Sequence, residues 1–174
     1  VKPVSETNYL DSPLKLYEKY FERVASEIEL FKKPVGLQAL ALVSFFGVLE
    51  HDNIKIREIL ESKFGINWSE LWSAIMELHG HEVLDVYAED TAKVSDQVLA
   101  TYAFYKCFLD ARSSVLNYGD WISEFIETHS SRLKTTLVDV NNTFNYEFVR
   151  DLVVPHLKRL SEGISDDGSL YAFY

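Results

Sequence analysis

The stretch EVLDVYAEDTAKV, residues 82–94, decides the fold class of this chain. The helical spacing of apolar residues stops here, and residues 82–87 and 92–94, which contain Val and Tyr, are typical of short strands. The residues between them, Ala88 to Thr91, provide a turn. On both sides of the stretch, apolar residues recur instead at spacings of three and four, which predicts helices. The sequence therefore predicts one β-hairpin within a mostly helical protein.

Three helices are predicted upstream of the hairpin, over residues 35–50, 52–63 and 68–79. The first is apolar on nearly every side, so we expect it in the middle of a hydrophobic core. Gly65 is a natural stop for the second helix, and Asn67 is the expected N-cap of the third. Three helices followed by a hairpin give the element order of a winged-helix unit. We therefore expect a three-helix core with the hairpin at its edge.

Further helices are predicted on both sides of this unit. A single apolar stripe predicts one helix over residues 12–33, which would end at Pro34. After the hairpin, Ser95 or Asp96 is expected to cap a helix that continues to Leu109. The remaining predicted helices form a helical arm, and we expect Pro155 to kink or split the last of them. They cover residues 120–129, 130–141 and 145–161.

Composition and charge restrict the class of function. The 174 residues include only 7 Gly and 4 Pro, which favours long helices over a many-stranded fold. Cys107 is the single cysteine, so no internal disulfide is expected and a reducing, cytoplasmic setting is the default. No signal peptide is visible, and the longest apolar stretch, residues 35–49, is too short to span a bilayer. We therefore expect no membrane partner.

The formal net charge of −10 is concentrated on the winged-helix-like unit. Residues 34–96 contain four basic and eleven acidic side chains, a net charge of −7. The third helix, over residues 68–79, has no Lys or Arg, and Glu89 and Asp90 lie at the hairpin tip. Because DNA binding requires several cationic contacts to phosphates, we expect no nucleic-acid partner for this surface. The charge pattern favours contacts with protein.

The string Val94-Ser95-Asp96, followed by the apolar residues Val98, Leu99 and Tyr102, resembles a motif of the STAND NTPases. In that family of signal-transducing ATPases, the chain leaves the winged helix through a Met-His-Asp-like motif that opens a helix. The resemblance implies three segments: a lead-in and lid-like helix over residues 1–33, a winged-helix-like domain over 34–110 and a helical arm segment over 111–174. It also implies an upstream nucleotide-binding domain as a partner in the same protein.

The same resemblance implies that Ser95 and Asp96 are cofactor-binding residues that sense nucleotide. In the family, the motif His contacts the β-phosphate of ADP; here the position is Ser95, which can donate a hydrogen bond but has no switchable charge. The alternative for both residues is a simple helix N-cap. ADP or ATP would reach them only through the upstream domain. No Gly is followed by Lys, so this segment lacks a P-loop and no catalytic residue is assigned.

The resemblance thus implies a non-catalytic regulatory segment of a signalling or defence ATPase, with possible homo-oligomeric assembly. Three alternatives stay open: a standalone helical protein-interaction module, a winged-helix transcription regulator, and a metal-dependent enzyme built on His79 and His81. The string His79-Gly80-His81-Glu82 resembles a set of metal ligands, but a polar turn between helix and hairpin is the favoured explanation, and no metal site is assigned. Cys107 lies among apolar residues and is expected to be a buried, unreactive thiol.

Overall fold

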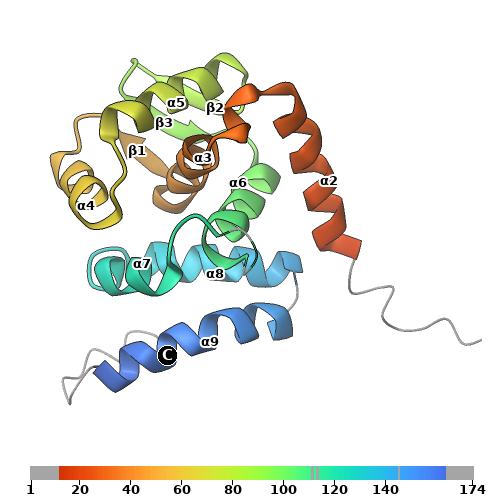
Figure 1. Cartoon of the computed structure of the whole chain (residues 1–174), viewed down its shortest axis with the longest axis vertical. Coiled ribbons are helices and arrows are strands. Elements are labelled where there is room, and N and C mark those ends of the chain that lie inside the picture. The colour runs from red at the N-terminus through yellow and green to blue at the C-terminus, as the bar shows by residue number, and fades with distance from the viewer. Residues whose placement is uncertain (1–11, 111, 113, 145, 164–174) are drawn as a thin grey trace, which may run out of the picture.

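The computed structural model describes residues 12–110, 112, 114–144 and 146–163, and Figure 1 shows its helices arranged around a small sheet. The described chain is mostly helical, as the sequence predicts. Residues 1–11 and 164–174, the ends of the first and last predicted segments, lie outside the described residues. The helical and strand elements, in chain order, are α2 (Ser12–Glu27), η1 (Glu29–Lys32), α3 (Pro34–Phe46), β1 (Val48–Glu50), α4 (Ile54–Phe64), α5 (Trp68–Gly80), β2 (Leu84–Tyr87), β3 (Thr91–Val94), α6 (Gln97–Phe104), η2 (Tyr105–Leu109), α7 (Tyr118–Phe125), α8 (Ser130–Phe144) and α9 (Tyr146–Gly163).

The predicted helix over residues 12–33 is two elements rather than one. The α-helix α2 stops at Glu27, Ile28 is extended with φ −122° and ψ 107°, and the short 3₁₀ helix η1 follows. Ile28 and Leu30 are both buried. In one continuous α-helix, residues two positions apart point about 200° away from each other, so both side chains reach the core only because the helix breaks between them.

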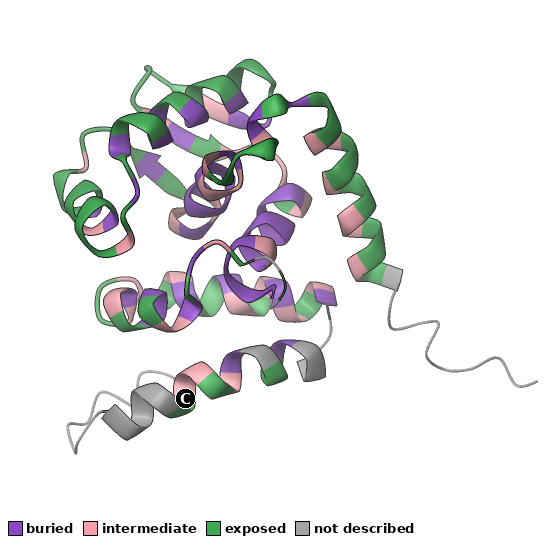
Figure 2. Cartoon of the chain, in the orientation of Figure 1, coloured by how far each residue is buried: buried purple, intermediate pink, exposed green. Residues whose placement is uncertain are grey.

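Helix α3 lies in the centre of the fold, as predicted, but is shorter than the expected range of 35–50. It packs against α5, α6, α8 and the sheet, and most of its residues are fully buried (Figure 2). It ends at Phe46 because Gly47 adopts φ 77° and turns the chain. The next three residues form strand β1, which the sequence analysis assigned to the helix.

Asparagine side chains fix the beginnings of α4 and α5. The Asn53 side chain accepts a hydrogen bond from the Ile56 N–H, so α4 starts at Ile54 rather than at the predicted residue 52. The Asn67 side chain accepts from the Glu70 N–H at 2.9 Å, which confirms the predicted cap. Gly65 ends α4 in the left-handed conformation, with φ 64°, as expected from its position.

The predicted hairpin is present as β2 and β3, and it belongs to a three-stranded antiparallel sheet in the order β1-β3-β2. The turn is tight: the Asp90 N–H donates to the Tyr87 carbonyl, while Ala88 and Glu89 have positive φ angles of 51° and 63°. Strand β1 joins the hairpin through the pairing of Leu49 with Ala92. The sheet therefore ties the end of α3 to the hairpin that follows α5.

The predicted helix that ends at Leu109 changes character halfway. The helix α6 is α-helical to Phe104, and η2 is a π-helical turn closed by a hydrogen bond from the Asp110 N–H to the Tyr105 carbonyl. All residues of η2 except Lys106 are buried, and the wider turn brings more consecutive side chains to the core than an α-helix does. Helix α9 continues through Pro155, so the expected split at this residue is wrong.

Buried side chains from all three predicted segments belong to one hydrophobic core. Phe45 of α3 and Trp121 of α7 are both fully buried, with ring centroids 5.1 Å apart, and this contact joins the three-helix unit to the arm. The cluster of aromatic rings is therefore core packing. Helix α9 packs on α7 and α8 (Figure 1).

Candidate functional site

Asp96 lies between β3 and α6 and is the N-cap of α6. Its Oδ1 accepts hydrogen bonds from the N–H groups of Val98 at 2.7 Å and Leu99 at 3.2 Å. Its Oδ2 accepts a hydrogen bond from the Tyr20 hydroxyl at 2.7 Å, and this bond is the main cause of the raised pKa of Tyr20. Asp96 is thus the predicted cap and also a tether for α2, a contact between residues 76 positions apart that local sequence patterns do not indicate.

Ser95 immediately precedes this cap and is exposed. In the described part of the chain, its hydroxyl makes no hydrogen bond, whereas both carboxylate oxygens of Asp96 have partners. The structure thus places both predicted residues at the N-terminus of α6. Of the two side chains, only that of Ser95 is exposed and without a hydrogen-bond partner among the described residues. Backbone N–H groups at a helix N-terminus attract anions, but here Asp96 already accepts from two of them.

His79 covers the free edge of strand β2. Its Nδ1 lies 3.0 Å from the Leu84 carbonyl oxygen and 3.3 Å from the Val86 nitrogen, so the ring bonds to one or the other according to its tautomer. Both backbone groups point away from β3. Within the described residues, no group of three His, Cys, Asp or Glu side chains is arranged to hold a metal ion.

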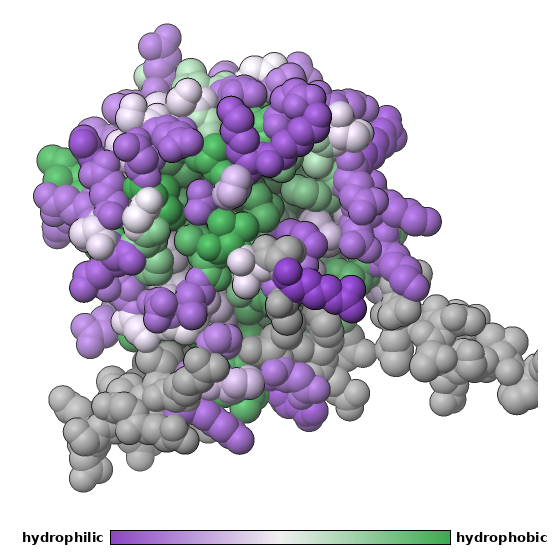
Figure 3. Space-filling view, in the orientation of Figure 1, coloured by the Kyte–Doolittle hydropathy of each residue, from purple (hydrophilic) through white to green (hydrophobic). Residues whose placement is uncertain are grey.

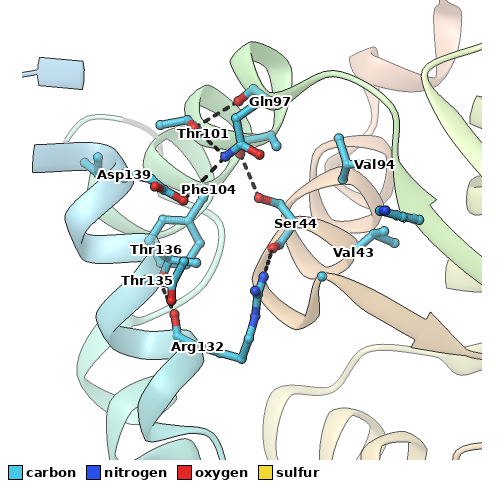
Figure 4. Close-up of a pocket in the computed structure, with 14 residues that line it drawn as sticks. Val43, Ser44, Val94, Gln97, Thr101, Phe104, Arg132, Thr135, Thr136 and Asp139 are labelled. Carbon is cyan, nitrogen blue, oxygen red and sulfur yellow. Dashed lines mark hydrogen bonds between the residues drawn. The ribbon is translucent and has the colours of Figure 1, made fainter. Parts of the chain in front are cut away.

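A hollow of about 230 Å³ lies between α3, β3, α6 and α8 (Figure 4). Three charged side chains line it: Lys93 from β3, and Arg132 and Asp139 from α8. Figure 4 shows Arg132 and Asp139 at different heights along α8, with Thr135 and Thr136 between them. The sequence analysis did not select these residues. The available signal was the seven-residue spacing of Arg132 and Asp139, which places both on one face of a helix.

Arg132 joins the two sides of this hollow. Its Nε donates to the Phe45 carbonyl at 2.6 Å and its Nη2 to the Ser44 carbonyl at 2.8 Å, so the guanidinium satisfies the last carbonyls of α3. Gly47 permits this approach, because a Cβ built there would lie 2.9 Å from Nη2. The cation also lies at the negative end of the α3 dipole, which is a favourable position.

At the other end of the hollow, Asp139 meets α6. The Gln97 side-chain amide lies 3.4 Å from Asp139 Oδ2 and 3.3 Å from the Thr101 hydroxyl. Ser44 donates to the Ala100 carbonyl at 3.0 Å, which holds α3 against α6. The hollow is therefore bounded by polar contacts on both sides.

The exposed face of α5 is acidic and lies beside a groove. Two adjoining hollows, of about 380 and 490 Å³, share Lys33, Val35, Asn67 and Glu70, and the second extends to Glu77. No Lys or Arg occurs in α5. Hydrophilic side chains cover the upper part of the molecule in Figure 3, over α5 and the hairpin. The geometry suits a partner with cationic groups rather than a polyanion.

Cys107 is fully buried in η2, and burial raises the pKa of its thiol to about 12. A thiol with this pKa is almost entirely protonated at neutral pH and is a poor nucleophile. The prediction of a buried thiol is confirmed.

Neither a protein-family model, nor a curated protein, nor a solved structure matches this chain. Its function is therefore inferred from its own residues and their arrangement. Among the described residues, no helix has the length and apolar character needed to cross a membrane.

Proposed function

We propose that this chain is a non-catalytic regulatory and interaction segment of a STAND-type signalling or defence ATPase, and that its α3–β3 unit is a winged helix that contacts protein. In this proposal the segment relays the nucleotide or ligand state of an upstream nucleotide-binding domain to assembly. The observation that supports this proposal most directly is a helix-and-hairpin unit whose third helix presents carboxylates where a DNA-binding surface needs cations.

The order of elements supports the winged-helix assignment. Helices α3, α4 and α5 precede the hairpin, and β1, from the connection after α3, pairs with β3 to complete a small sheet. Since β2 follows α5 directly, the hairpin stands beside the third helix, where a wing is expected.

Charge supports a protein partner. The exposed side chains of α5 include Glu70, Ser73 and Glu77, and the turn of the hairpin exposes Glu89 and Asp90. A phosphate backbone would meet repulsion at each of these carboxylates. A protein surface with Lys or Arg side chains would be attracted, and the groove beside α5 provides an apolar floor at Leu30 and Ala74.

The proposal gives Ser95 and Asp96 different roles. Asp96 fixes the start of α6 and holds α2 through Tyr20. Ser95, whose side chain is exposed at the same helix end, is the residue proposed to donate a hydrogen bond to nucleotide held by the upstream domain.

The proposal is tested first on the gene and then on the whole protein. We expect the reading frame upstream of this segment to encode G-x-x-x-x-G-K-[ST]. In the purified full-length protein, exchange of ADP for an ATP analogue should alter hydrogen–deuterium exchange in α5 and the hairpin. A double charge reversal, Glu70→Lys with Glu77→Lys, should reduce this nucleotide-dependent difference, whereas Glu58→Lys on the exposed side of α4 should preserve it.

Two outcomes would overturn the proposal. A gene without an upstream nucleotide-binding domain would leave the standalone helical interaction module. Tight binding to duplex DNA in fluorescence anisotropy, with a steep loss of affinity as salt rises, would identify a transcription regulator instead.

A further inference from the structure

The hollow between α3, β3, α6 and α8 has a distribution of charge that the proposed function does not use. Residues of the winged-helix-like unit form one wall and residues of α8 form the other (Figure 4). We propose that this hollow binds a small zwitterion, a straight-chain amino acid with its carboxylate and its ammonium group at opposite ends. The inference does not depend on the ATPase assignment or on the α5 face.

The cationic end of the hollow retains unused hydrogen-bond donors. Arg132 donates one N–H each to the carbonyls of Phe45 and Ser44. Of its five N–H donors, three make no hydrogen bond within the described part of the chain. Lys93 also lines the hollow, is exposed, and forms no ion pair with any described residue. A carboxylate placed here would meet two cations: the Arg132 guanidinium, which is held by α3, and the Lys93 side chain, which extends from the sheet.

The anionic end retains an unused acceptor. Asp139 Oδ2 is 3.4 Å from the Gln97 amide, which is a long hydrogen bond, and Oδ1 has no partner among the described residues. The Gln97 side chain is held by the Thr101 hydroxyl at 3.3 Å, so it supports the carboxylate from α6. An ammonium group beside Asp139 would supply the missing donor and the missing opposite charge.

The spacing and size of the hollow define the ligand. Seven residues separate Arg132 from Asp139, so their Cα atoms lie about 10 Å apart along α8. A ligand that contacts both side chains therefore needs its two charged groups at opposite ends of its carbon chain. Side chains of Val43, Val94 and Phe104 supply an apolar floor for the carbon chain. The volume of about 230 Å³ is below that of pockets for drug-sized molecules.

The experiment uses γ-aminobutyrate as the probe, because it is a short straight-chain molecule with a carboxylate at one end and an ammonium group at the other. Titration of the ¹⁵N-labelled chain by NMR should shift amide signals of α6 and α8 and give a dissociation constant of about 1 mM. Butyrate lacks the ammonium group and n-butylamine lacks the carboxylate, so each should bind at least tenfold more weakly.

Two conservative variants locate the site, and two controls match them. Asp139→Asn and Lys93→Met should each weaken γ-aminobutyrate at least tenfold, whereas Glu58→Gln and Lys55→Met, which alter exposed side chains of α4, should leave the affinity unchanged. Arg132 is not substituted in this experiment, because its hydrogen bonds hold the end of α3. Equal binding of the single-charge analogues, equal binding by the Asp139→Asn variant, or no signal shifts at saturating ligand would each overturn the inference. None of these results bears on the upstream gene or on α5.

Discussion

At the scale of single residues, the end of α3 depends on Gly47 and Arg132 together. Gly47 has a positive φ of 77°, and the guanidinium of Arg132 occupies the space that a Cβ would take. A side chain at this position would therefore disturb both the backbone turn and the charged hydrogen bonds to the carbonyls of Ser44 and Phe45. Gly47 has a structural role that its place inside an apolar run does not indicate.

Replacement of Gly47 by Ala should destabilise the protein by about 2–3 kcal/mol, through backbone strain and displacement of Arg132. Thermal unfolding would show this as a fall in Tm of about 5–10 °C. Gly80→Ala is the matched control, because a Cβ there has no atom within 4 Å and φ is not positive. Equal stability of the two variants would contradict the assigned role of Gly47.

His129 makes stability dependent on pH. It packs against the rings of Phe45, Phe46 and Phe125, and burial, followed by the nearby Arg132 charge, lowers its pKa below the ordinary value of 6.5. The unfolded chain therefore binds a proton more readily than the folded chain. Stability from this group is complete above pH 6.5 and is lost as the pH falls toward the folded-state pKa.

Urea unfolding at pH 7.5 and pH 5.5 tests this prediction. The unfolding free energy of the wild type should fall more over this interval than that of a His129→Gln variant, which cannot titrate. Other acids and histidines affect both proteins alike. The difference between the two decreases in unfolding free energy therefore isolates the contribution of His129. Equal decreases in unfolding free energy for the two proteins would show that the pKa of His129 is the same in the folded and unfolded chains.

At the scale of elements, the hairpin turn carries local strain. Ala88 and Glu89 both have positive φ, the sign that type I′ turns require at their central positions, and neither residue favours it. Asn-Gly is the pair that adopts this conformation most readily. The hairpin forms despite its turn residues, because β3 is held between β1 and β2.

The double substitution Ala88→Asn with Glu89→Gly should therefore stabilise the protein by about 1 kcal/mol, or raise Tm by about 2–4 °C. The contrasting variant, Glu58→Asn with Ile59→Gly inside α4, should destabilise the protein, since Gly disfavours a helix interior and the packing of Ile59 against the core is lost. An unchanged or lowered Tm for the turn variant would show that the strand pairing, and not the turn, limits hairpin stability.

Elements with a local signal were predictable from the sequence, and those that depend on distant contacts were not. Asn67 and Gly65 mark helix ends through their own side chain and backbone, and the hairpin shows where the helical spacing of apolar residues stops. Strand β1 has three residues and is defined by pairing with β3, more than forty positions later. The Arg132 contacts with α3 and the Tyr20 bond to Asp96 likewise join separate elements, so the hollow beside α8 had no local pattern.

At the scale of the whole molecule, the negative charge and the buried core are arranged separately. The acidic excess lies on the exposed surfaces of α5 and the hairpin, whereas the core runs continuously from Ile28 to Val153. A partner at α5 would thus act on a helix packed directly against α3, and α3 in turn contacts α6 and α8. Because the interior is tightly packed, a displacement of α5 would be transmitted through α3 to α6 and α8.

The bond between Arg132 and the end of α3 also has a consequence for biosynthesis. Arg132 and Phe45, whose carbonyl accepts one of these hydrogen bonds, are 87 positions apart in the chain. At about 5–20 residues per second, the ribosome needs about 4–17 s to add the residues that separate Phe45 from Arg132. During this interval the nascent chain carries an apolar helix whose final carbonyls lack their partner. We therefore expect chaperone binding to this stretch during translation to be most favourable before α8 has been made.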